Sequence, residues 1–217
     1  MSRLAQIVSL EEDFEQIVFV VDDDESMRVA LTHLFRSMNL HVEVFSTATA
    51  LLESELPNIP GCLVLDIRLP GMNGLDFQET LAKAGIHIPI VFMTGHGDIP
   101  MSVKAMKAGA VDFLPKPFRD QDILDAVIRA LDQDRKRRDE EKVVSRLRDL
   151  FESLTRRERQ VLTHVISGLM NKEIAYRLQV SEITVKIHRG HMMKKMEARS
   201  LVDLVRMAEM LGVKRTN

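Results

Sequence analysis

Short apolar runs alternate with helical patterns through the first 130 residues of the chain. The apolar runs at 17–21, 62–65, 88–93 and 111–114 are bounded by turn residues, which is typical of buried parallel strands. Helices are predicted between and after them, over 25–38, 47–56, 74–84, 99–108 and from about 120 onward. Glycines and prolines fall between these elements or at their ends.

This alternation predicts an α/β doubly wound, flavodoxin-like domain with a five-stranded parallel sheet. The simplest strand order is 2-1-3-4-5. In such a sheet the ligand site lies beyond the carboxyl ends of the strands.

After residue 131, a run of charged residues replaces the alternation of apolar runs and helical patterns. Residues 132–142 contain no apolar residue, and no Gly or Pro occurs from 118 to 167. This run is either a solvated helix with interleaved charges or a mobile linker, and the missing breakers favour the helix. Apolar residues return between 143 and 154 at heptad-like spacing, which fits a short coiled-coil seam and packing on the next domain equally well.

The remaining chain has only helical patterns. Thr155-Arg156-Arg157-Glu158 has the sequence of a capping box and opens a helix that Gly168 ends. A second short helix that contains Ile174, Ala175 and Leu178, a tight turn at 179–181 and a third helix at 182–196 predict a helix-turn-helix. A fourth helix covers 200–211. We divide the chain into an N-terminal extension (1–16), the α/β domain (17–131), a charged helical linker (132–153) and an all-α domain (154–217).

The net charge of −2 hides a difference between the two halves. Residues 1–131 carry 10 Lys and Arg against 19 Asp and Glu, whereas residues 132–217 carry 20 against 13. The acidic half suits a cation or a protein partner, and the basic half suits a polyanion. The single cysteine, Cys62, lies in a predicted buried strand. With no signal peptide and no apolar run of membrane-spanning length, we expect a cytoplasmic protein without membrane contact.

Polar residues with complementary chemistry follow the predicted strands. The acidic run Asp22-Asp23-Asp24 follows the first, and Asp66, Thr94 and Lys116 end or follow three others. The fold would gather them at one edge of the sheet. Carboxylates, a hydroxyl and an ammonium suit a hard cation such as Mg²⁺ and a phosphoryl group. A solvated turn or a helix cap is the alternative for the acidic run alone.

The strings VFVVDDDESMR, LVLDIRLPGMNGL, FMTGHGD and AGAVDFLPKPF occur in this order over residues 15–131. As a set they resemble the receiver domain of response regulators. The resemblance implies that Asp66 is the phosphoacceptor and that Asp22, Asp23, Asp66 and the backbone carbonyl of Arg68 hold Mg²⁺. It also implies that Thr94 and Lys116 contact the phosphoryl group and that Phe113 is the switch aromatic. Arg68 and His96 are large enough to screen the phosphoryl group from water.

The segment LTRRERQVLTHVISGLMNKEIAYRLQVSEITVKIHRGHMMKKM resembles the LuxR-type helix-turn-helix. With a receiver domain in front, the chain is similar to the NarL/FixJ family, FixJ-like branch. The resemblance implies that the third helix enters the DNA major groove, with Lys186 and Ile187 as base-edge candidates. The phosphate candidates are Lys172, Thr184, His188, Arg189, Lys194 and Lys195. Gly190 falls where some relatives have a lysine, so no base contact can be transferred there.

The resemblance implies a phosphorylation-controlled transcription regulator whose partners are a sensor histidine kinase and double-stranded promoter DNA. We expect a homodimer in the phosphorylated state, with RNA polymerase as a further candidate partner. The protein would not be an enzyme beyond catalysing its own phosphorylation and dephosphorylation. A phosphatase of the haloacid-dehalogenase type also uses Asp and Mg²⁺, but that class needs an Asp two residues after the nucleophile, where this chain has Arg68.

Overall fold

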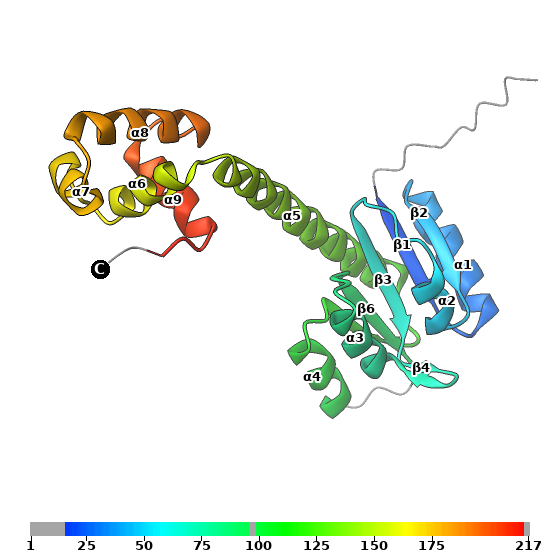
Figure 1. Ribbon diagram of the computed structural model, residues 1–217. Coiled ribbons are helices and arrows are strands. Elements are labelled where there is room, and N and C mark those ends of the chain that lie inside the picture. The colour runs from blue at the N-terminus through cyan, green and yellow to red at the C-terminus, as the bar shows by residue number, and fades with distance from the viewer. Residues whose placement is uncertain (1–15, 96–98, 215–217) are drawn as a thin grey trace, which may run out of the picture. The chain divides into compact units, whose positions relative to one another are not determined.

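The computed structural model describes residues 16–95 and 99–214 (Figure 1). The predicted N-terminal extension therefore lies almost entirely outside the described residues. These residues form two compact units, divided between Arg138 and Asp139. In the described part of the chain, no helix has the length and apolar character that crossing a membrane requires.

The first unit is built on a five-stranded parallel sheet with the order β2-β1-β3-β6-β7. This order equals 2-1-3-4-5 when only the strands of this sheet are counted, so the predicted topology is confirmed. Its strands are β2 (His41–Phe45), β1 (Ile17–Val21), β3 (Gly61–Asp66), β6 (Ile90–Thr94) and β7 (Asp112–Pro115). The inner strands β1, β3 and β6 are buried along their whole length, as continuous apolar runs require.

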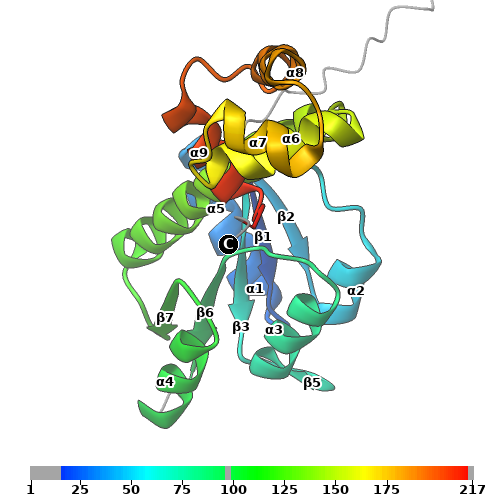
Figure 2. The same cartoon turned by 60° about the vertical axis from the view of Figure 1, so that its left-hand side comes forward.

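Helices cover both faces of this sheet (Figures 1 and 2). One face packs against α1 (Glu25–Ser37) and the start of α5 (Asp120–Glu152), through Leu31, Phe35 and Ile123 among others. The other face packs against α2 (Ala48–Glu53), α3 (Gly74–Lys83) and α4 (Ile99–Lys107). Alternate residues of each strand point to opposite faces, so both clusters draw on the same strands.

A short hairpin was not predicted. Strands β4 (Arg68–Leu69) and β5 (Met72–Asn73) pair antiparallel just after β3. The turn between them contains Pro70 and Gly71, and Gly71 has φ +81°. Two residues per strand are too few to give an alternating pattern, so only the Pro-Gly turn signalled this hairpin.

Helix α5 is continuous from Asp120 to Glu152 and runs through the division between the two units. Of the two alternatives for residues 132–142, the structure therefore has the helix. Asp134, within this charged run, is fully buried and accepts hydrogen bonds from the backbone amide of Gly61 at 3.0 Å and from Arg138 at 2.6 Å. The helix is thus attached to the sheet beyond residue 131, while the exact limits of the linker stay a prediction.

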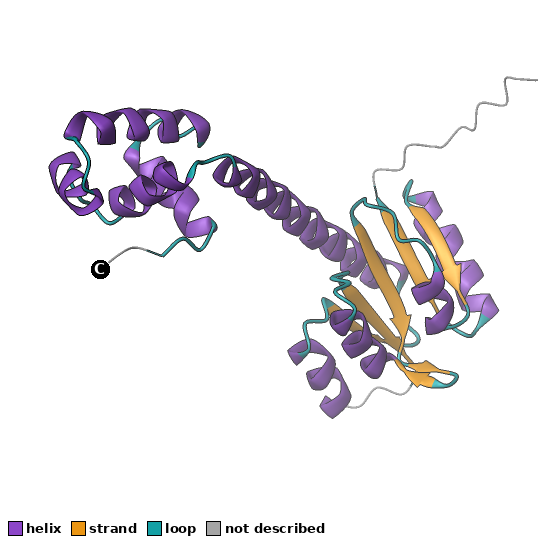
Figure 3. Cartoon of the chain, viewed as in Figure 1, coloured by secondary structure: helices purple, strands orange, loops and turns teal. Residues whose placement is uncertain are grey.

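The second unit contains only helices among its described elements (Figure 3). These are α6 (Arg156–Ile166), α7 (Asn171–Leu178), α8 (Glu182–Lys195) and α9 (Leu201–Met210). Its core is completed by Leu150 and Phe151 from the end of α5. For these two residues the structure shows packing on the second domain, one of the two predicted alternatives; a coiled-coil seam stays a prediction.

Candidate functional site

The three consecutive aspartates after β1 have three different environments. Asp22 is fully buried, and its Oδ1 accepts a hydrogen bond from the Asp24 amide at 2.9 Å. Asp24 caps helix α1 by accepting from the Ser26 amide at 2.8 Å. Asp23, between them, is exposed. The helix-cap alternative is therefore correct for Asp24 only, and the other two carboxylates are available for chemistry.

Lys116 joins the ends of three strands. Its Nζ lies 2.6 Å from Asp22 Oδ2 and 2.7 Å from Asp66 Oδ2. Asp66 ends β3, is mostly buried, and also accepts a hydrogen bond from the Arg68 amide at 3.0 Å. We call Asp22, Asp23, Asp66 and Lys116 the acidic cluster. The sequence prediction that strand ends would bring these side chains together is confirmed.

The acidic cluster has the donor set of a hard-cation site. One carboxylate oxygen from each of Asp22, Asp23 and Asp66 lies within 4.8 Å of the others. Three carboxylates face one ammonium, so the cluster has an excess of negative charge that a divalent cation would neutralise. Oxygen ligands of this kind are those that Mg²⁺ and Ca²⁺ prefer.

The electrostatics of the cluster keep Lys116 charged. Burial lowers the pKa of Lys116, but hydrogen bonds to Asp22 and Asp66 outweigh this effect, so its pKa is raised overall. Burial is also the largest influence on Asp22 and raises its pKa, against the hydrogen bonds from Lys116 and the Asp24 amide. Removing Asp22 from water therefore costs free energy that Lys116 offsets only in part.

Thr94 and Phe113 lie on the neighbouring strands. Thr94 ends β6 and is fully buried, and its carbonyl accepts a hydrogen bond from the Lys116 amide at 2.7 Å. Phe113, in β7, is half-buried and packs against the core beneath α4. The peptide bond between Lys116 and Pro117 is cis. His96 lies outside the described residues, and Arg68 is exposed at the start of the short hairpin.

Two residues that support the cluster were missed from the sequence. The guanidinium of Arg28, in α1, donates to the Asp22 carbonyl at 2.7 Å. A Cβ on Gly74 would lie 2.8 Å from the Asp66 carbonyl oxygen, so only glycine allows α3 to begin this close to the strand end. Arg28 lies six residues beyond Asp22, and nothing in the sequence around it indicates a contact with that residue. For Gly74, the second glycine of GMNGL was the one available sign that two backbones approach closely there.

The second unit contains the predicted helix-turn-helix. Helix α7 ends at Leu178 and is followed by Gln179, which has φ 55° in the left-handed region. Ser181 caps α8 by accepting from the Thr184 amide at 3.1 Å. Val185 and Met192 fix α8 to the core. Met192 and Met196 are buried, and Met193 packs against the same core.

The outer face of α8 carries exposed side chains suited to DNA. Lys186, Ile187 and Lys194 are exposed, as their predicted roles require. Ile183, one turn before Ile187, is 73% exposed and was missed, although its spacing places it on this face. Gly190 lies on the same face, and a Cβ there would have no atom within 4 Å. None of the residues that the structure describes therefore requires a glycine at this position.

The remaining predicted DNA residues differ in how free they are. Lys172 is exposed, and His188 is half-buried. The Thr184 hydroxyl lies 2.7 Å from that of Ser181, and Arg189 donates to Asn171 at 3.1 Å. Lys195 already has two partners within the chain, Glu158 at 2.8 Å and the Ser153 carbonyl at 3.2 Å.

Comparison with known families agrees with both units. Residues 18–128 match the response regulator receiver domain, and residues 152–208 match the bacterial regulatory proteins of the luxR family. Nodulation protein W of Bradyrhizobium diazoefficiens is 59% identical over 203 residues, covering 94% of this chain and 89% of that protein. The chain belongs to the NarL/FixJ family of response regulators.

Further relatives place it in the FixJ-like branch of this family. FixJ of Azorhizobium caulinodans is 43% identical and covers 90% of this chain and 93% of its own length. Among solved structures, the response regulator StyR is 51% identical, with TM-score 0.81, over 90% of this chain and 98% of that one. Full-length FixJ from B. japonicum is 39% identical, with TM-score 0.55, over 93% of this chain and 100% of that one. The protein is a phosphorylation-controlled transcription regulator, whose receiver domain implies a histidine kinase partner and whose helix-turn-helix implies DNA binding.

Proposed function

We propose that this response regulator accepts a phosphoryl group on Asp66 and thereby changes its dimerisation and its binding to promoter DNA. A carboxylate oxygen of Asp66 attacks the phosphorus of a phosphohistidine, and the P–N bond breaks as the new P–O bond forms. The histidine of the kinase leaves with the electron pair of the broken bond and takes up a proton. The observation that carries this proposal is the Lys116 ammonium, 2.7 Å from Asp66, in a cluster with three carboxylates.

The donor set of the acidic cluster favours Mg²⁺ as the cofactor. Asp22, Asp23 and Asp66 would hold the ion, with the backbone carbonyl of Arg68 as a fourth protein ligand. When bound, Mg²⁺ neutralises charge on the phosphoryl oxygens during transfer. Lys116 supplies the second positive charge, and the buried Thr94 supplies a hydroxyl at the adjacent strand end.

The phosphoryl group would bias a two-state change in the receiver domain. Thr94 moves toward the new phosphoryl oxygens and Phe113 follows into the space that Thr94 leaves. The surface over 99–118 then changes and pairs with a second copy of the chain. Ile99, Val103 and Met106 support this step, since all three are large apolar residues exposed on α4.

In the DNA-binding domain, α8 would lie in the major groove. Lys186 and Ile187 are proposed to contact base edges, and Lys172, Thr184, His188, Arg189 and Lys194 to contact phosphates. The exposure of Lys186, Ile187 and Lys194 supports these roles. RNA polymerase is a further candidate partner of the DNA-bound dimer.

The decisive experiment is phosphorylation of the purified chain with acetyl phosphate and Mg²⁺. We expect one phosphoryl group per chain, and Asp66→Asn should remove it because an amide cannot act as the nucleophile. Asp112→Asn is a matched control, since Asp112 is a receiver aspartate that pairs with Arg129 outside the acidic cluster. Full labelling of Asp66→Asn would refute the assignment.

A further inference from the structure

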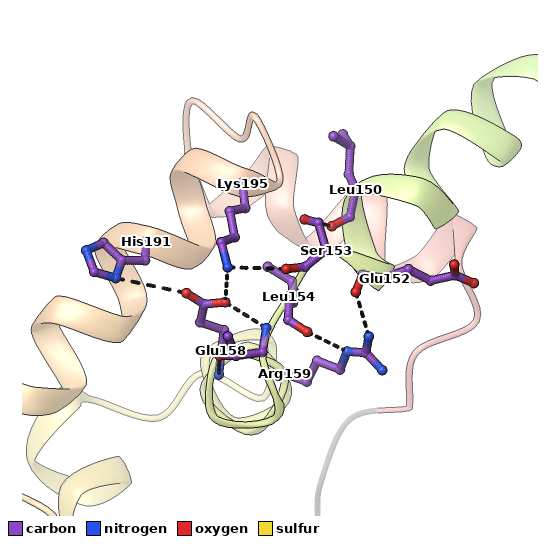
Figure 4. A network of polar contacts seen from close by, with 9 residues as sticks. Leu150, Glu152, Ser153, Leu154, Glu158, Arg159, His191 and Lys195 are labelled. Atoms are coloured by element: carbon purple, nitrogen blue, oxygen red, sulfur yellow. Dashed lines mark hydrogen bonds and ion pairs between the residues drawn. The ribbon is translucent and has the colours of Figure 1, made fainter.

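A buried carboxylate lies at the centre of the DNA-binding domain's polar contacts (Figure 4). Glu158, in the first turn of α6, has a side chain that is 4% exposed. Its Oε2 accepts hydrogen bonds from the Thr155 amide at 2.8 Å and from Lys195 Nζ at 2.8 Å. Because a buried carboxylate without a cation would be strongly unfavourable, Glu158 holds the Lys195 ammonium in place.

Lys195 also reaches the end of α5. Its Nζ donates to the Ser153 carbonyl at 3.2 Å, one residue beyond the last residue of that helix. We call Glu158, Lys195, Thr155 and the Ser153 carbonyl the Glu158 network. It joins three elements: the C-terminal end of α5, the N-terminal end of α6 and the last turn of α8.

A second cation holds the same end of α5. Arg159 donates to the Glu152 carbonyl at 2.8 Å and to the Leu154 carbonyl at 3.1 Å (Figure 4). The last carbonyls of a helix have no partner within it, so Arg159 and Lys195, which bind the Glu152 carbonyl and the carbonyls just after it, act as its cap. Arg146 of α5 also forms an ion pair with Glu197, just after α8. The end of α8 is therefore connected to α5 at two separate places.

The neighbouring lysine has a different environment. Lys194 is exposed, and the described residues give its ammonium neither a hydrogen bond nor an ion pair. Lys195 is only partly exposed and has two partners that would be lost if its ammonium turned toward DNA. Moving it would leave the buried Glu158 with the exposed His191, whose Nδ1 lies 4.0 Å from Glu158 Oε1, as its remaining basic neighbour (Figure 4). Lys194 can approach a phosphate without breaking a contact of this kind.

We infer that Lys195 is a positioning residue for the recognition helix α8, acting through Glu158 and the Ser153 carbonyl, and not a phosphate contact. This inference rests on the proposed DNA binding by α8 and revises the role expected for Lys195 from the sequence. The Glu158 network fixes the last turn of α8 against α5 and α6, and so fixes the angle at which the base-reading residues are presented. Sequence preference, more than overall DNA affinity, then depends on Lys195.

The test compares Lys195→Met with Lys194→Met in the full chain. Duplexes are first selected by the wild-type protein from a random pool, and binding is then measured to a selected duplex and to a scrambled one across a salt series. Lys195→Met should reduce the preference for the selected duplex about tenfold and leave the salt dependence unchanged. Lys194→Met should weaken both duplexes alike and reduce the salt slope by about one.

Hydrogen exchange and a conservative variant separate positioning from general stability. In Lys195→Met the last turn of α8 should exchange about tenfold faster, the size expected for hydrogen bonds to a charged group. Lys195→Arg should restore the preference, because a guanidinium can still reach Glu158. Glu158→Gln should match Lys195→Met, and the double variant should lose no more than either one.

Each other outcome contradicts the inference. A lower salt slope for Lys195→Met would make it a phosphate contact. Faster exchange with unchanged duplex preference would reduce it to a stabilising residue, and no change in either would leave the network without a role. If the wild type selected no duplex, the proposed function would fail instead, and exchange alone would decide whether Lys195 holds α8 in place.

Discussion

Each unit of the molecule contains a lysine bonded to a buried carboxylate, but the two clusters differ in their charge balance. In the acidic cluster Lys116 faces three carboxylates, one of them the exposed Asp23. In the Glu158 network one ammonium faces one carboxylate, and backbone groups complete the hydrogen bonds. The first cluster has charge left for a ligand, whereas the second satisfies its own groups.

This difference in charge balance separates residues that bind a ligand from residues that stabilise the fold. Burying charge costs free energy, and a set of side chains whose positive and negative charges are paired within the fold, which we call a matched set, offsets that cost. An unmatched set recovers it only when something binds, so it indicates a site. Asp134 belongs with the matched sets, because Arg137, Arg138 and the Gly61 amide together satisfy its carboxylate. The predictions below test this distinction.

The largest expected effect is selective stabilisation of the receiver unit by Mg²⁺. At a Mg²⁺ concentration one hundred times its Kd, an ion that binds only the folded state adds about 2.7 kcal/mol to the free energy of unfolding. Hydrogen exchange in β1, β3 and β6 should slow accordingly, and exchange in α6 and α8 should not change. Asp23→Ala should weaken the effect, because it removes one of the three clustered carboxylates and a unit of negative charge from the site. Equal slowing in both units would indicate a general salt effect and remove the distinction.

Glu158 should make the DNA-binding unit sensitive to acid. Burial raises the pKa of Glu158, but hydrogen bonds from Lys195 and Thr155 outweigh it, so its pKa is lowered overall. A carboxyl group with a lowered folded-state pKa stabilises the fold above its ordinary value of 4.5, and the contribution is lost as pH falls through the folded-state pKa. Glu158→Gln should therefore cost about 1.5–3 kcal/mol at neutral pH and progressively less below pH 4.5.

The cost of Glu158→Gln is measured by hydrogen exchange in α6 and α8 as a function of pH, and Glu173→Gln provides the matched control. Glu173 accepts a hydrogen bond from the Met170 amide at 2.7 Å, much as Glu158 does from Thr155, but it is exposed and no lysine pairs with it in the described residues. Its substitution should change hydrogen exchange in α6 and α8 little at any pH. If both variants behaved alike, the helix cap would explain the effect of Glu158, and the pairing with Lys195 would contribute nothing.

The sequence was informative where function follows the order of strands. Asp22, Asp66, Thr94 and Lys116 end or follow parallel strands, and the fold alone brings such ends to one edge. The capping box at Thr155 was likewise a local pattern, and it is present. These elements were predictable because each depends on a few adjacent residues.

The matched clusters could not be predicted, because their partners are far apart in the chain. Asp134 stands in a run with no apolar residue, yet its partner amide belongs to Gly61, 73 residues earlier. Glu158 and Lys195 are 37 residues apart, and each taken alone resembles an ordinary surface charge. Tertiary packing decides which charges of such a run are buried, and periodicity contains no information about it.

Substitution of Lys186 tests whether a lysine of α8 without a partner in the fold binds DNA. Its exposed ammonium has no ion pair among the described residues, so it is free to donate to guanine. Lys186→Ala should cost about 1–3 kcal/mol on the selected duplex and much less on a scrambled one. Equal weakening on both duplexes would make it a backbone contact, with Ile187 and Thr184 next in line for specificity.

Gly190 should show the smallest effect, with opposite signs for stability and binding. A glycine inside a helix costs about 0.5–1 kcal/mol relative to alanine, and a Cβ at 190 would meet no atom of residues 16–95 or 99–214 within 4 Å. Gly190→Ala should therefore stabilise the DNA-binding unit by about that amount and slow hydrogen exchange in α8. Because the described residues give no reason for the glycine, we propose that it allows close approach of DNA, and on this proposal the same variant should bind the selected duplex more weakly. Gain of stability with unchanged binding would show that Gly190 serves neither the fold nor the interface. Unsatisfied charged groups, and not an unexplained glycine, would then be the features that indicate a binding site.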